Sequence, residues 1–133
     1  MSGFETQLFA VKIAEASSMG RAKWSLVHPL VFNSDILGRR IVVPQWFTTD
    51  YASVPRMPLA FWLTGDTAHA SAVIHDYLCR EWYPACKISW RMAADVFREC
   101  MWHEGVPVWR RAIMHWAVMQ ADPAKKNSWS DES

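Results

Sequence analysis

The chain has 133 residues, of which 51% are hydrophobic and 20% are charged, and its formal net charge is +1. This length and composition fit one globular domain with its own core and exclude an intrinsically disordered chain. Because acidic and basic residues nearly balance, the long-range field that attracts a protein to nucleic acid or anionic lipid is missing, and we expect neither as a main partner. No apolar run approaches the roughly 18 residues that a membrane span needs.

The first half of the chain predicts β-structure. Phe9 to Ile13 is a candidate strand, and the apolar runs Trp24 to Phe32 and Ile41 to Val43 flank a turn, which predicts a hairpin. Gly38 can adopt the positive φ that such a turn needs, and Pro44 should end the strand pairing because it has no N–H to donate.

Residues 45–58 predict a loop of fixed shape. The stretch holds two prolines, which restrict φ, and a dense set of hydroxyl groups around one carboxylate. These side chains can bond to nearby backbone, which favours an ordered turn: Thr48, Thr49, Asp50 and Ser53. A short helical turn is expected at 59–63.

Three helices are predicted in the second half. Their start and stop signals are N-cap residues, a proline at the first position and glycine or proline after the end. The expected ranges are Asp66 or Thr67 to Arg80 or Trp82, Trp90 to His103 after the cap Ser89 and before Gly105, and Pro107 to Gln120. In the last helix, Val108, Ala112, Ile113, Trp116 and Met119 or Gln120 share one face.

These elements predict an α+β fold, with one small antiparallel sheet from the N-terminal third followed by three helices packed on one another and on the sheet. Residues 1–123 should form a single domain, and residues 124–133 a polar, flexible tail. The 9 tryptophans are unusually many, and because Trp is rarely buried completely, several rings should lie half exposed at an interface or a groove. Cys79, Cys86 and Cys100 match no zinc or redox spacing, which predicts free thiols. The N-terminus has no basic segment ahead of its apolar residues, which predicts a cytosolic protein.

The stretch Ala70 to Arg80 sets neighbouring polar residues, His75 and Asp76, into an apolar helical run. Burying an unpaired charge is expensive, so each needs a partner. Because consecutive helices usually pack as antiparallel neighbours, we expect Asp95 to accept a hydrogen bond from His75 and to leave the other ring nitrogen free as a base. Asp76 points about 100° away round the helix, so it would serve a cation or the 48–53 loop instead.

Three interpretations of this cluster stay open. In the first, it is an active site at which His75 and Asp95 are catalytic, Asp50 and Asp76 hold a divalent metal or the substrate, and four residues contact substrate: Thr49, Ser53, Arg56 and Tyr77. In the second, the same residues only lock the helices together and brace the loop on them. In the third, the cluster has some other binding role. The remaining histidines are isolated, and the chain has no phosphate-binding loop, serine-hydrolase elbow or zinc motif.

Three motifs follow one another along the chain: T-D-Y-A-S-V-P-R at 49–56, A-x-x-H-D-Y-L at 72–78 and A-D-V-F-R-E-C-M at 94–101. With these motifs, from Trp24 to Met119, the sequence resembles a family of small uncharacterised proteins of tailed bacteriophages and prophages. The resemblance implies a phage origin and a location in the host bacterial cytoplasm or in the virion. It implies no activity.

The run H-D-Y-L with the later A-D also resembles the active-site helices of phospholipase A2, in particular the compact viral form. That resemblance implies His75 as base, Asp76 as calcium ligand and Asp95 as the carboxylate that orients the base. The chain departs from the pattern because it has no Gly-rich calcium loop and no disulfide framework, and because Cys79 or Arg80 stands where a Tyr is usual.

Two functions are therefore expected. The first is a small phage-encoded hydrolase, acting on an ester, amide or phosphoester in a polar pocket where the 48–56 loop meets the helix ends. The second is a non-catalytic virion, tail or assembly component, which binds other phage structural proteins or a second copy of itself through Trp-rich surfaces.

Overall fold

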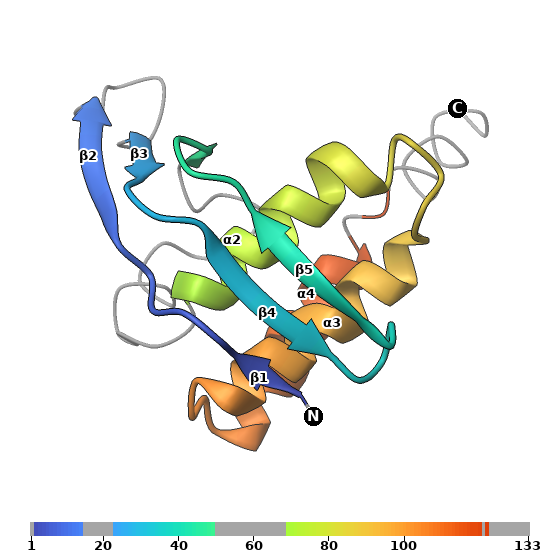
Figure 1. The fold of residues 1–133 in the computed structure, drawn as a ribbon. Coiled ribbons are helices and arrows are strands. Elements are labelled where there is room, and N and C mark those ends of the chain that lie inside the picture. Colours follow the sequence, from blue (N-terminus) through green and yellow to red (C-terminus); the bar gives the residue numbers. More distant parts are fainter. Residues whose placement is uncertain (1, 15–22, 50–68, 121, 123–133) are drawn as a thin grey trace.

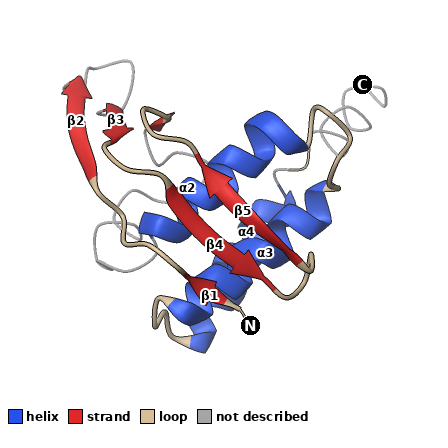
Figure 2. Cartoon of the chain, viewed as in Figure 1, coloured by secondary structure: helices blue, strands red, loops and turns tan. Residues whose placement is uncertain are grey.

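The structure, a computed structural model, describes residues 2–14, 23–49, 69–120 and 122. Its strands are β1 (Gly3–Phe4), β2 (Ala10–Ala14), β3 (Lys23–Leu26), β4 (Leu30–Ser34), β5 (Arg39–Val43) and β6 (Thr48–Thr49). Its helices are α2 (His69–Tyr77), the π-helix η1 (Leu78–Trp82), α3 (Trp90–His103) and α4 (Val108–Gln120). Helices α2 and α3 cover one face of the sheet that contains β4 and β5, and α4 packs on α3 (Figures 1 and 2). The predicted α+β class is confirmed.

The hairpin of β4 and β5 supplies the β part of the core. Its antiparallel register places Leu30 opposite Val43 and Phe32 opposite Ile41, and all four side chains are buried. Strand residues alternate between faces, so Arg40 lies on the other side of the sheet and is exposed. Gly38 has the expected positive φ of 64° in the turn. The hairpin and its turn were thus predicted, but the first arm is shorter than the predicted run Trp24 to Phe32, because that run divides into β3 and β4.

The structure forms two small sheets where the sequence predicted one, with strand orders β1-β4-β5 and β2-β3-β6. The chain separates them at the bend 27–29, between β3 and β4. There the carbonyl of Val27 accepts a bond from the Gln45 side chain at 2.8 Å, and Pro29 has no N–H with which to extend a ladder. Strand β3 therefore pairs with β2 and β6, whereas β4 pairs with β1 and β5.

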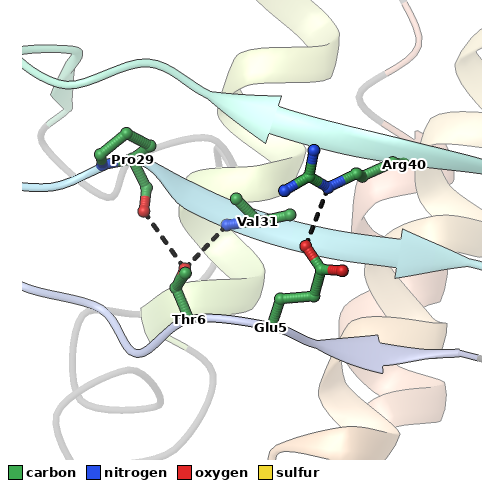
Figure 3. A network of polar contacts seen from close by, with 5 residues as sticks. All are labelled: Glu5, Thr6, Pro29, Val31 and Arg40. Carbon is green, nitrogen blue, oxygen red and sulfur yellow. Dashed lines mark hydrogen bonds and ion pairs between the residues drawn. The ribbon is translucent and has the colours of Figure 1, made fainter.

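The segment between β1 and β2 is fixed to β4 by side chains. The Thr6 hydroxyl accepts a hydrogen bond from the Val31 N–H at 2.9 Å and donates one to the Pro29 carbonyl at 3.2 Å (Figure 3). The Arg40 Nε donates to the Glu5 carboxylate at 2.8 Å across the same strand. Together with the backbone bond from the Glu5 N–H to the Val31 carbonyl at 2.9 Å, these bonds hold residues 5–6 against β4.

The helix ends follow the local signals. The Ser89 hydroxyl accepts from the Met92 N–H at 3.1 Å as the N-cap of α3, and Gly105 follows the helix with φ 80°. The helix before it ends at Trp82 as predicted, but its last turn is a π-helix, in which the Tyr83 N–H bonds to the Leu78 carbonyl five residues back. The predictions for 59–63, for the N-cap at 66–67 and for the tail 124–133 lie outside the described residues.

The Glu99 carboxylate on α3 binds two segments that lie far from it in the sequence. It accepts hydrogen bonds from the Ser2 hydroxyl at 2.9 Å, from the Ser34 hydroxyl at 2.7 Å and from the Asp35 N–H at 2.8 Å. Bonds to an ionised acceptor are stronger than neutral ones. Glu99 thereby ties the N-terminal strand and the hairpin turn to the helical layer.

Candidate functional site

The His75 side chain lies in a closed apolar environment. Its exposed fraction is zero, its ring is 4.9 Å from the Phe97 ring and 6.0 Å from the Trp90 ring between centroids, and its Nε2 is 3.4 Å from the Cys79 sulfur. Burial lowers the pKa of His75 to about 3, so the ring is neutral at pH 7. Bulk water does not reach it. This environment is that of a packing residue.

Asp95 does not meet His75. It accepts a hydrogen bond from His115 on α4, with 2.7 Å between Nε2 and the carboxylate oxygen. The reason is its position on α3: Phe97 packs against His75, and a residue two positions away points about 200° round the helix. The predicted hydrogen bond between His75 and Asp95 is therefore replaced by two separate contacts, a ring contact inside and a polar pair at the α3–α4 boundary.

Asp76 is buried like His75, but charged and polar groups surround its carboxylate. It lines a cavity of about 280 Å³ together with Lys23, Thr48, Thr49 and Arg80. The Arg80 guanidinium donates to the Asp76 carboxylate at 3.2 Å and to the Thr48 carbonyl at 2.7 Å. The start of the T-D-Y-A-S motif and the H-D-Y-L motif thus meet at one cavity. The π-helical turn carries Arg80 to this contact.

Tyr77 braces the same region from the apolar side. Its ring packs edge-on against Phe47, 5.5 Å away, and against Trp82, 6.4 Å away. Ser71, which the sequence analysis did not single out, donates both its N–H, at 2.6 Å, and its hydroxyl to the Glu104 carboxylate. That bond fastens α2 to the end of α3. The only feature of the sequence that indicated a role for Ser71 was its hydroxyl group within an apolar helical run.

The predicted metal ligands and the cysteines complete the set of candidate residues. No group of three or more His, Cys, Asp or Glu converges there as a cation site. The predicted partners Asp50, Ser53 and Arg56 lie outside the described residues. All three cysteines are free, as predicted. Burial, and then the charge of Asp76, raise the pKa of the Cys79 thiol to about 12, and burial raises that of Cys100 as well.

Helix α4 is apolar on two opposite faces. Met114 and Val118 are buried against α3, in one cluster with Phe97. Trp109, Ile113 and Trp116 recur at intervals of four and three on the other side, and Trp109 and Trp116 are 59% and 64% exposed. The apolar face that the sequence pattern marked on this helix is thus the one that faces solvent. The expectation of half-exposed Trp rings is confirmed here and at Trp46 and Trp102.

Comparison with known proteins identifies a family and no closer relative. The family described as a protein of unknown function, DUF1353, matches residues 24–118, which is most of the chain. No curated protein and no solved structure gives a significant match. No helix in the described part of the chain is long and apolar enough to cross a membrane.

Proposed function

This chain belongs to the DUF1353 family, and we propose that it is a non-catalytic component that binds another protein through the outer face of α4. The observation that carries the proposal is the pair of opposite apolar faces on that helix. We call Trp109, Ile113 and Trp116 the tryptophan face. A solvent-facing helix is ordinarily polar on its outer side, so a row of large apolar groups there is typical of an interface.

The residue types of this face also support binding. Trp is enriched among the few residues that carry most of the free energy of protein association, because it buries a large area at a small cost in side-chain entropy. Single exposed apolar residues are ordinary, but Trp109, Ile113 and Trp116 follow one another on successive helical turns. We propose a virion, tail or assembly protein as the partner, because the resemblance to proteins of tailed phages and prophages implies a phage origin.

The environment of His75 supports the same choice. A catalytic base must reach the proton that it removes, and it works best with a pKa near the operating pH. The His75 ring is fully buried and its pKa is lowered to about 3. In this proposal, His75 and Phe97 hold α2 against α3, while the Asp95–His115 pair joins α3 to α4.

The experiment is a particle-association assay in induced host cells. The double variant Trp109→Ala/Trp116→Ala should be lost from sedimenting virions or assembly intermediates, whereas the unaltered protein and Trp46→Ala should remain with them. Trp46 is the matched control because it is as exposed as Trp116, at 64%, and lies outside α4. A double variant that still sediments with particles, or an unaltered chain that never does, would contradict the proposal.

A second candidate, the phage-encoded hydrolase, is favoured by the cavity that gathers Asp76, Arg80 and Thr49. In this candidate the acidic group in contact with substrate or metal is Asp76, with Asp50 as a further ligand. The predicted roles of His75 and Asp95 would require α2 and α3 to rearrange, because His75 is closed off and Asp95 bonds elsewhere. Ester, amide and phosphoester substrates with and without Mg²⁺ or Ca²⁺ test it. Turnover that Asp76→Asn abolishes would support it, and no turnover on any class would remove it.

A further inference from the structure

We infer that the outer face of the β1-β4-β5 sheet binds a small carboxylate that carries an apolar body about the size of an aromatic ring. The site lies on the side of the sheet that α2 and α3 do not cover, and it shares no residue with the tryptophan face. The inference is therefore independent of the proposed function. It rests on a cavity, on the apolar residues that line it and on one guanidinium at its rim.

The floor of the cavity is apolar. A cavity of about 580 Å³ opens on the outer face, between the segment that follows β1 and the strands β4 and β5. This volume lies in the range of small-molecule sites, roughly 300 to 1,000 Å³. Val31 and Val42, which are paired across β4 and β5, both line it. Val31 is almost covered, whereas Val42 is 40% exposed and would be removed from water by an apolar ligand.

One side of the cavity is aromatic. The Phe9 and His28 rings lie edge to face with 5.5 Å between their centroids, and both line the cavity beside Pro29. Half of the Phe9 surface is exposed, although the side chain is large and apolar. A flat ring in the cavity can stack on these groups, and such aromatic pairs are favourable beyond the area that they bury. The apolar part of the ligand is therefore the size and shape of an aromatic ring.

The cationic group at the rim is the Arg40 guanidinium. Its Nε donates to the Glu5 carboxylate at 2.8 Å, and within the described part of the chain its two terminal nitrogens have no acceptor. Arg40 lines the cavity, and Figure 3 shows these nitrogens turned away from Glu5, on the side of Val31 and Pro29. A guanidinium binds a carboxylate through two parallel N–H bonds, so this edge can accept a second carboxylate.

The rim selects a ligand with one negative charge. Among the described residues, Arg40 is the one Lys or Arg that lines the cavity, and Glu5 already balances part of its charge. A dianionic phosphate group would be repelled by Glu5 and would leave the apolar floor uncovered. The Gln7 amide and the His28 ring also line the cavity and can donate further hydrogen bonds. A monocarboxylate with an apolar body fits both the guanidinium and the floor.

The experiment is an NMR titration of the full chain that follows the valine methyl signals. The probe is hydrocinnamate. Its matched controls are hydrocinnamide, which lacks the charge, and acetate and inorganic phosphate, which lack the apolar body. Hydrocinnamate should shift the signals of Val31 and Val42 and leave that of Val118, in the core between α3 and α4, unchanged. It should bind at least about tenfold more tightly than each control, because a hydrogen-bonded charge and an apolar contact are each worth that factor.

Two pairs of variants locate the charge and the floor. Arg40→Gln should weaken hydrocinnamate at least about tenfold and leave hydrocinnamide unchanged, whereas Arg98→Gln, at an exposed position of α3, should affect neither. Val42→Glu places a carboxylate at the floor and should abolish binding. Val11→Glu, at a comparably exposed position of β2, should not change it.

A further probe distinguishes the source of the carboxylate. Tighter binding of N-acetyl-glycyl-phenylalanine than of hydrocinnamate would identify the C-terminus of a peptide as the ligand, and weaker binding would identify a free acid. Both results support a carboxylate site. Equal affinity for hydrocinnamate and hydrocinnamide would overturn the inference, as would phosphate bound as tightly as hydrocinnamate, signals that shift only outside the cavity, or no shift with any probe. Particle association tests the tryptophan face separately, so either proposal can fail alone.

Discussion

Helices α2 and α4 differ in how much of their surface is buried within the chain. In α2, every residue from Ala70 to Asp76 is buried, including the polar Ser71 and His75. In α4, only Met114 and Val118 are buried, and the opposite side presents Trp rings to solvent. Helix α2, which carries the H-D-Y-L motif, is thus packed almost entirely against the rest of the chain. Helix α4, which carries no motif, has an apolar surface that another molecule can cover. A conspicuous polar residue in an apolar run is therefore as informative about packing as about chemistry.

The largest effect that tests the contrast between α2 and α4 is the loss of folding stability in acid. The pKa of His75 is about 3 in the folded chain and 6.5 in its ordinary state. As the pH falls below about 6.5, the unfolded chain binds a proton at His75 and the folded chain does not, so the free energy of unfolding decreases until the pH nears 3. The full loss is on the order of 5 kcal/mol. Denaturant unfolding at stepwise pH measures it.

The matched variant for this titration is His75→Leu, which keeps an apolar side chain against Phe97. It should lose the part of the acid dependence that His75 causes, while the other histidines and the carboxylates contribute equally to both proteins. If the two proteins showed the same change of stability between pH 7 and 4, His75 would not be closed off from water, and α2 would no longer contrast with α4.

The two faces of α4 give the next largest effect. Met114→Ala removes a fully buried side chain and should cost about 2 to 5 kcal/mol of unfolding free energy. Trp116→Ala removes a larger side chain from the exposed face and should change stability by no more than about 0.5 kcal/mol. Urea denaturation of both variants tests the pair. A Trp116 variant as unstable as the Met114 variant would place the tryptophan face in the core.

The Asp95–His115 pair should have the smallest effect. Both side chains are partly exposed, and surface pairs contribute between zero and about 1 kcal/mol. A double-mutant cycle with Asp95→Asn and His115→Gln, followed by thermal denaturation at pH 6, isolates the coupling between them. A coupling of about 3 kcal/mol or more would mean that the pair is a buried structural bond and not a boundary contact.

Local signals predicted the elements well because their causes are local. Ser89 caps α3, Gly38 takes positive φ in the hairpin turn, and β5 ends at Val43 before Pro44, each because of the residue type at that position. The one sheet that was expected became two because a bend at 27–29 decides which strands pair, and pairing depends on residues far along the chain.

The candidate site was harder to predict because it depends on how helices are rotated about their axes. The sequence shows that His75 and Asp95 lie on neighbouring helices, but not that Phe97 is the residue of α3 that faces His75. The distance between Asp95 and Phe97 in the chain was a usable signal, since both cannot point to one neighbour. The sequence of α4 has apolar residues on two sides of the helix. Only tertiary packing decided that the side with Met114 is the buried one.

The Glu99 carboxylate has a consequence for the order of events in folding. Its hydrogen bond to the Ser2 hydroxyl joins residues 97 positions apart in the chain. That bond forms only after α3 has been made and has come against the sheet, and contacts between residues so far apart slow folding. The pairing of β1 with β4 needs only residues 3–33, so it can precede the attachment to α3.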